Sequence, residues 1–195
     1  MNPSLLEDLN YLNMQEIKAV CSKLNIPYKI HYEHEGKVRP SGEIDRKDII
    51  LARIRQLVET GRCTDKTIYP AKVVSFAPLN SPLKAEDHVY YGQYKTTQKP
   101  ILRLMKTLTD NQFKFGAISQ IVIRDFWRIG KAPTYRQFAH AWKKALQAHD
   151  KPRPEWAFLT DLAAGMDMKD WKKYRVKKAK AVLVELGSFS LTSKG

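Results

Sequence analysis

Prolines divide this chain into two regions of helical periodicity, and this division constrains the fold more than any other feature of the sequence. Four of them lie between residues 62 and 100: Pro70, Pro78, Pro82 and Pro100. Proline lacks a backbone N–H and blocks helix continuation, so this stretch has room only for short strands at 71–76 and 88–94. On both sides of it, apolar residues recur three and four positions apart, which is typical of amphipathic helices.

We therefore expect a mainly α protein with few short strands at most. The predicted segments are an N-terminal helix–loop–helix module at 1–61, a proline-containing connector at 62–99, and a small helical domain at 100–195 whose last helix is basic. With 195 residues, of which 43% are hydrophobic, the chain is long enough to bury a core.

Two helices of the first region begin and end with characteristic residues. Asn13 followed by Glu16 forms a capping-box pattern, and Asn25 stands where a helix commonly ends in the left-handed conformation. Asp45 is the expected N-cap of the second helix, which Gly61 ends. These signals predict two helices separated by a long connection.

This first region resembles the SAP motif, a DNA-binding helix–extended–helix, as it occurs in bacterial proteins. Residues 16–27 read EIKAVCSKLNIP, which is similar to the family pattern E-L-K-x-L-L-x-x-x-G-L-P. The second half of the pattern, K-x-x-L-x-x-R-L, is matched by Lys47, Ile50, Arg53 and Ile54. The N-terminal module of the transcription terminator Rho is similar around residues 46–50. The resemblance implies DNA binding and makes Arg53 a candidate binding residue.

A second resemblance covers the region after residue 100. In some bacterial proteins a SAP-like module precedes an uncharacterised helical domain that is similar to this chain at ten positions: Ile101, Leu102, Arg103, Phe113, Lys114, Phe115, Phe126, Thr134, Ala141 and Trp142. Because that domain has no established activity, this resemblance implies the order of the domains and no mechanism.

Basic residues surround the predicted start of the second helix. Arg46 and Lys47 stand at a helix N-terminus, where free N–H groups and the helix dipole favour a phosphate. Lys37 and Arg39 lie in the connection Tyr28–Ile44, which we expect to be an extended loop with room for a short hairpin at 31–38. The sequence predicts phosphate contacts by these four side chains; pairing with nearby Asp45 and Asp48 is the alternative.

The chain is strongly basic, with 34 Lys and Arg against 20 Asp and Glu and a net charge of +14. This excess favours nucleic acid as a partner, because phosphate neutralisation releases counterions. Residues 1–60 hold nine basic and nine acidic residues, so the excess lies after them. At 100° per residue, four lysines of the last helix share one face, opposite an apolar face that includes Trp171 and Val176: Lys169, Lys173, Lys177 and Lys180. A solvated helix face is the alternative.

Other side-chain groups point to no catalytic site. His31 and His34 with two neighbouring glutamates can hold a metal ion, but a polar hairpin tip explains them better. Tyr28, Tyr32 and Trp156 are candidates for stacking on bases, although most such residues belong to a core. We expect no cofactor, no metal and no membrane span. No secretory signal is visible, so we expect a cytoplasmic protein, with association with the nucleoid as an option.

These observations favour a non-catalytic nucleic-acid-binding protein, with duplex DNA preferred and RNA open as a ligand. Two alternatives remain from other classes. The neutral first region also fits a protein-interaction adaptor that uses the SAP-like module as a scaffold. A metal-dependent enzyme acting on nucleic acid is the third hypothesis, with Asp161 and Asp167 as possible but unpatterned carboxylates.

Overall fold

The computed structural model describes residues 3–148 and 153–188, which divide into two compact units. Unit 1 comprises residues 3–29, 43–66 and 153–188, and unit 2 comprises Ile30–Gly42 and 67–148. Neither unit is a continuous segment, so they do not follow the predicted segments 1–61, 62–99 and 100–195. The C-terminal helices pack with the N-terminal ones instead of with the helices that precede them.

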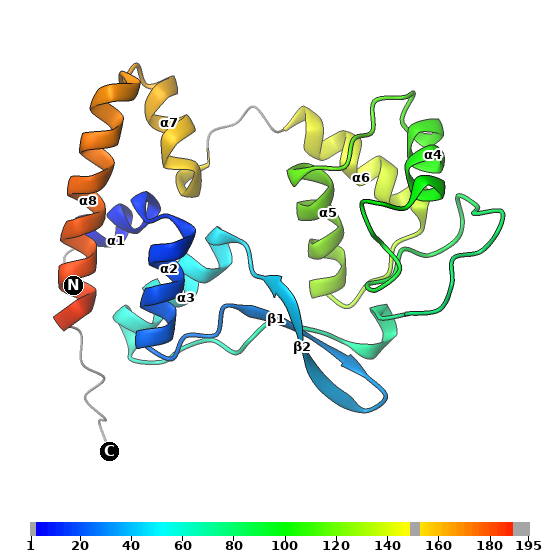
Figure 1. The fold of residues 1–195 in the computed structure, drawn as a ribbon, viewed down its shortest axis with the longest axis horizontal. Coiled ribbons are helices and arrows are strands. Elements are labelled where there is room, and N and C mark those ends of the chain that lie inside the picture. The colour runs from blue at the N-terminus through cyan, green and yellow to red at the C-terminus, as the bar shows by residue number, and fades with distance from the viewer. Residues whose placement is uncertain (1–2, 149–152, 189–195) are drawn as a thin grey trace. The chain divides into compact units, whose positions relative to one another are not determined.

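Unit 1 is built of helices only. In chain order its elements are α1 (Pro3–Asp8), η1 (Leu9–Tyr11), α2 (Met14–Lys23), α3 (Lys47–Thr60), η3 (Pro154–Trp156), α7 (Ala157–Ala163) and α8 (Met168–Ser188). Helix α8 packs on α1 and η1, as the red and dark blue ribbons of Figure 1 show. Its residues Ala179, Val182 and Leu186 join one buried cluster with Leu9 and Ile17, which explains why the two ends of the sequence meet.

Helix ends in unit 1 follow the sequence signals with one exception. The capping box of α2 is confirmed: the Asn13 side chain accepts from Glu16 N at 2.9 Å, and Asn13 N donates to the Glu16 carboxylate at 2.8 Å. Asn25 and Gly61 adopt the expected positive φ, 54° and 70°. The N-cap of α3 is Arg46 and not Asp45. The predicted Asp45 cap is wrong because its carboxylate points inward.

Unit 2 combines a small sheet with three helices. Its elements are β1 (Lys29–His34), β2 (Lys37–Ile44), β3 (Ile68–Tyr69), η2 (Ala71–Val73), α4 (Lys99–Leu108), α5 (Ala117–Arg128) and α6 (Tyr135–Gln147). The strand order is β2-β1-β3, and β1 runs parallel to β3 with His31 opposite Ile68 and Tyr32 opposite Tyr69. The hairpin thus continues into unit 2, while its first and last residues belong to unit 1.

The expectation of few short strands at most is wrong, although helices dominate the described residues. The connection 28–44 is a hairpin of six- and eight-residue strands instead of an extended loop, and it belongs to a three-stranded mixed sheet. Glu35 and Gly36 form its turn with φ of 52° and 69°, the handedness that two-residue hairpins prefer. The predicted strands at 71–76 and 88–94 reduce to isolated bridges such as Val74 with Tyr91.

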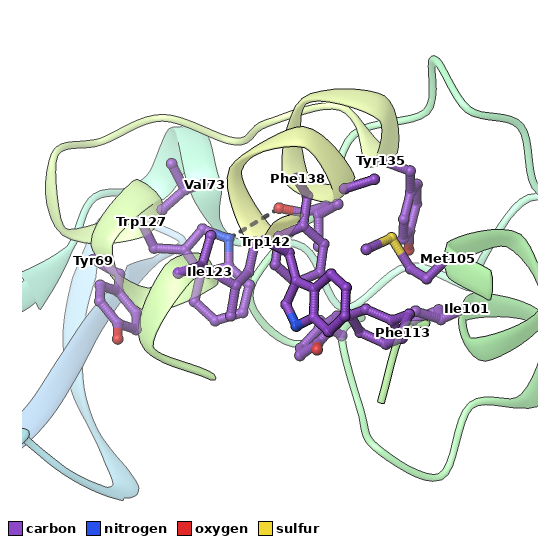
Figure 2. Packing of buried hydrophobic residues seen from close by; sticks show 14 of the residues in the cluster. Tyr69, Val73, Ile101, Met105, Phe113, Ile123, Trp127, Tyr135, Phe138 and Trp142 are labelled. Carbon is purple, nitrogen blue, oxygen red and sulfur yellow. Dashed lines mark hydrogen bonds between the residues drawn. The ribbon is translucent and has the colours of Figure 1, made fainter. Parts of the chain in front are cut away.

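The core of unit 2 is unusually aromatic, as Figure 2 shows around Trp127, Phe138 and Trp142. The indole N–H of Trp127 donates to the backbone oxygen of Val89 at 2.9 Å inside this cluster. That bond fixes the connector segment on α5, because both groups are buried and a lost partner would leave the other unsatisfied. A buried hydrogen bond therefore anchors this segment to α5, although the segment has no regular secondary structure.

We expect Asp45→Ala to lower the free energy of unfolding by about 3 to 5 kcal/mol. The Asp45 carboxylate accepts from Arg53 at 2.7 Å with both side chains buried, so the substitution leaves an uncompensated charge in the core. Urea unfolding followed by circular dichroism measures the change. The double variant Asp45→Ala/Arg53→Met is the control, and it should recover much of the loss. A single variant as stable as the original chain would contradict this account.

Candidate nucleic-acid interface

The basic residues at the start of α3 are engaged within unit 1. Arg46 donates to the Asp48 carboxylate at 2.9 Å. Lys47 Nζ donates to the backbone oxygen of Asn10 at 2.5 Å. Arg53 is only 4% exposed, because its guanidinium donates to Asp45 and to the backbone oxygen of Pro27 at 2.8 Å. These side chains stabilise the SAP-like helix pair, and Arg53 has no surface to offer a phosphate.

Lys47 occupies an environment that disfavours its charge. Burial, and after it the positive charge of Arg175, lowers the pKa of Lys47 to about 8. Among the described residues, the Lys47 ammonium donates to the backbone oxygen of Asn10. At neutral pH this amine is still mostly protonated, but it is turned to a backbone oxygen of unit 1, in contrast to the phosphate contact that the sequence predicts for it.

Lys37 and Arg39 lie on β2, in unit 2, whereas Arg46 and Lys47 lie in unit 1. The two pairs are therefore described separately, each within its own unit. Both hairpin cations are exposed. Arg39 pairs with Glu35 at 2.9 Å, an exposed pair of the kind that contributes about 1 kcal/mol or less and exchanges readily. Lys37 and Arg39 thus remain available to a ligand of unit 2.

Helix α8 separates its cations into inward and outward sets. Arg175 donates to the Glu16 carboxylate, and Lys178 donates to the Asp8 carboxylate at 2.9 Å, so both tie α8 to the N-terminal helices. The outward set is exposed and forms no ion pair within the described residues: Lys169, Lys172, Lys173, Lys177 and Lys180. We call these five residues the α8 lysine face; the four predicted lysines are among them.

The predicted apolar face of α8 needs one correction. Ala179, Val182 and Leu186 are buried as expected. Val176 is 57% exposed and lies among the lysines instead of on the buried face, and Val184 is 66% exposed one turn beyond Lys180. With Ala179, Val182 and Leu186 packed in the core, Arg175 and Lys178 face their carboxylates and Val176 faces outward. The α8 lysine face therefore carries two apolar side chains between its charges.

A second basic surface was missed by the sequence interpretation. Lys99, Arg103 and Lys106 are exposed on α4 at spacings of four and three residues, which places them on one side of the helix. We call these three residues the α4 basic face. The available signal was the absence of acidic residues from 88 to 109, a window that holds four Lys and Arg. The signal is weak because α4 has only ten residues and so carries only three of these cations.

The aromatic candidates have mostly structural partners. Tyr28 packs against the core of unit 1, and Tyr32 packs against the core of unit 2. The Trp156 ring lies under the Arg153 guanidinium at 5.2 Å. Phe76 was not among the predicted stacking residues, yet it is 51% exposed. Of these rings, Phe76 presents the largest accessible surface.

The described residues contain neither a metal-ligating cluster nor a helix that could span a membrane. Within 3–148 and 153–188, no group of three or more His, Cys, Asp or Glu side chains is placed to hold a metal ion. His31 and His34 lie three positions apart on β1, so they point to opposite faces of the strand. In the same residues, none of the helices combines the length and the apolar character that crossing a bilayer requires.

We expect the free energy of unfolding to rise between about pH 8 and pH 10.5 through Lys47. In this window the unfolded chain holds the Lys47 proton while the folded chain, with a pKa of about 8, has lost it. Unfolding then takes up a proton, so stability increases with pH. Urea midpoints of the original chain and of Lys47→Met at about pH 7.5 and pH 10 measure the difference. Identical pH dependences would show that the amine titrates normally in the fold.

Comparison with known proteins gives no match. No protein-family model fits this chain, no curated protein is similar to it, and no solved structure resembles it. The resemblance to the SAP motif stays a prediction that rests on residues 16–27 and 47–54 alone.

Proposed function

We propose that this chain is a non-catalytic nucleic-acid-binding protein that contacts phosphates through the α8 lysine face and the α4 basic face, with duplex DNA as the preferred ligand. The observation that carries the proposal is the sorting of charge on α8. Arg175 and Lys178 turn inward to carboxylates, and five lysines remain outward without acidic partners in the described residues. A face of this kind creates a positive potential that attracts anions.

The dimensions of the α8 lysine face suit a polyanion. Lys169 and Lys180 are eleven residues apart, which corresponds to about 16 Å along a helix. Duplex DNA carries a phosphate charge for every ~1.7 Å of its axis, so a duplex of this length carries about ten phosphates, of which the helix faces those on one side. Lysine is a flexible point charge and can reach several of them without a fixed register. The expected binding is therefore largely independent of sequence.

The α4 basic face supports the proposal from unit 2. Unit 2 holds 16 basic and 7 acidic residues over 30–42 and 67–151, and unit 1 holds the other 18 basic and 13 acidic residues. The excess of positive charge is therefore larger in unit 2, and the SAP-like resemblance does not extend to that unit. Two phosphate-binding surfaces on one chain raise the affinity for a long ligand when both can engage it.

A membrane surface fits α8 less well than nucleic acid does. An interfacial helix inserts an apolar face of Trp, Phe or Leu side chains among the lipids. The apolar side of α8 is already buried inside unit 1, at Ala179, Val182 and Leu186. The exposed side offers Met168, Val176 and Val184 among five lysines, and none of these is the Trp, Phe or Leu of an interfacial helix. A protein partner remains the alternative; binding of an acidic protein without binding of nucleic acid would favour it.

We expect Lys173→Glu to weaken duplex DNA binding about equally for all sequences and to reduce the slope of log affinity against log salt by about 1, because one phosphate contact is lost. Lys66→Glu is the matched control: it changes the net charge equally and stands on an exposed residue of unit 1 outside α8. Arg103→Glu with the control Lys84→Glu makes the same comparison for the α4 basic face.

Fluorescence anisotropy with labelled duplexes at about 50 and 200 mM salt measures these effects. The same titration with duplex RNA decides between the two ligands. No binding at the lower salt concentration, or an affinity that does not change with salt, would overturn the proposal. Equal losses in Lys173→Glu and Lys66→Glu would show that overall charge, and not the α8 lysine face, drives binding.

A further inference from the structure

We infer that unit 2 binds an unpaired base of a single-stranded nucleic acid by stacking it on Phe76, while Lys37 and Arg39 contact the adjoining phosphates. This inference rests on the proposed function and adds the kind of strand to it. It places the contact on the β1–β2 hairpin and the segment 73–76, which are other elements than α8 and α4.

Phe76 is an exposed ring set in an aromatic cluster. Its centroid lies 5.0 Å from the His34 ring, 5.6 Å from Tyr32 and 6.4 Å from Tyr91, in edge-to-face geometry. Tyr32 and Tyr91 pack against the core of unit 2 behind it. Phe76 remains 51% exposed after these contacts. The neighbouring rings meet Phe76 at steep angles, and half of the residue stays accessible, which leaves surface for another planar group.

The backbone also fixes the position of Phe76. Ser75 N donates to the backbone oxygen of Tyr91 at 2.9 Å, which pairs the two segments. Gly92 follows with φ of +94°, and a Cβ there would lie 2.6 Å from Ser75 O and 2.7 Å from Phe76 Cδ1. The ring therefore rests against backbone that only glycine permits. A ring that is already held in place loses little conformational entropy when a base stacks on it.

The turn of the hairpin places two cations beside this ring. Positive φ at both Glu35 and Gly36 gives a two-residue turn, so His34 stands opposite Lys37, and Tyr32 stands opposite Arg39. Opposed residues share one face of a hairpin and lie about 5 Å apart. Lys37 and Arg39 thus lie on the face whose Tyr32 and His34 contact Phe76.

An exposed ring with cations beside it is the combination by which proteins bind single-stranded nucleic acids. In a duplex the bases are stacked on each other and cannot offer a free face to a side chain. An unpaired base can stack on an aromatic ring whatever its identity, while neighbouring cations follow the phosphates. Val38 lies on the opposite face of β2 and is 48% exposed, so it does not belong to this arrangement.

Phe76→Leu is the discriminating variant, because leucine keeps an apolar side chain but removes the aromatic face. We expect it to weaken binding of a single-stranded dT oligomer about 5- to 100-fold and to leave duplex binding unchanged. Phe76→Trp should retain or increase the affinity, since indole also stacks. Val38→Ala is the matched control on the other face of the hairpin, and it should bind the oligomer as the original chain does.

The outcomes separate this inference from the proposed function. If the original chain binds neither duplex nor oligomer, both fail. If it binds duplex in a salt-dependent way but Phe76→Leu binds the oligomer with unchanged affinity, only stacking on Phe76 is overturned. Thermal unfolding of Phe76→Leu, compared with Phe76→Trp, verifies that unit 2 is folded in both variants. A parallel titration with oligo-U shows whether RNA or DNA is the stronger single-stranded ligand.

Discussion

The burial of one side of α8 decides how unit 1 is organised. Ala179, Val182 and Leu186 can leave water only by packing on the segment Leu9–Ile17, so the end of the described chain closes on its beginning. That contact sets the rotation of the helix about its axis. Once the rotation is set, Arg175 and Lys178 point to carboxylates, and the remaining lysines point to solvent. The candidate interface is therefore a consequence of apolar packing and not a separately built site.

Cations in this protein serve two purposes that residue type alone does not distinguish. Arg53 is buried against Asp45 and keeps α3 in register with the end of α2 through the Pro27 carbonyl. Removing one partner of such a pair costs several kcal/mol, whereas an exposed pair such as Arg39 with Glu35 contributes about 1 kcal/mol or less. Phosphate binding draws on the second class, because only exposed charges can exchange a weak internal partner for an external one.

The sequence predicted the helices well because their signals are local. The cap at Asn13 and the left-handed residues at Asn25 and Gly61 act within one turn, and the structure confirms them. It predicted the sheet poorly because β1 pairs with two residues of β3 more than thirty positions away. Periodicity also predicted that four lysines of α8 share a face, and all four are exposed; their role in binding stays a prediction. The motif could not show that Arg53 is buried, since a buried pair and a phosphate contact use the same residue types.

Phosphate contacts and base stacking respond differently to ionic strength, and unit 2 carries the groups for both. Counterion release makes the contribution of the lysine and arginine residues fall steeply as salt rises. Stacking of a base on the Phe76 ring involves no counterion, so its contribution persists. A protein with both kinds of contact retains more of its affinity for single strands than for duplexes as salt increases. The preference for single strands over duplexes would then depend on the salt concentration. The reason is that the Phe76 ring, which rests against Gly92, adds a contact that duplexes cannot make.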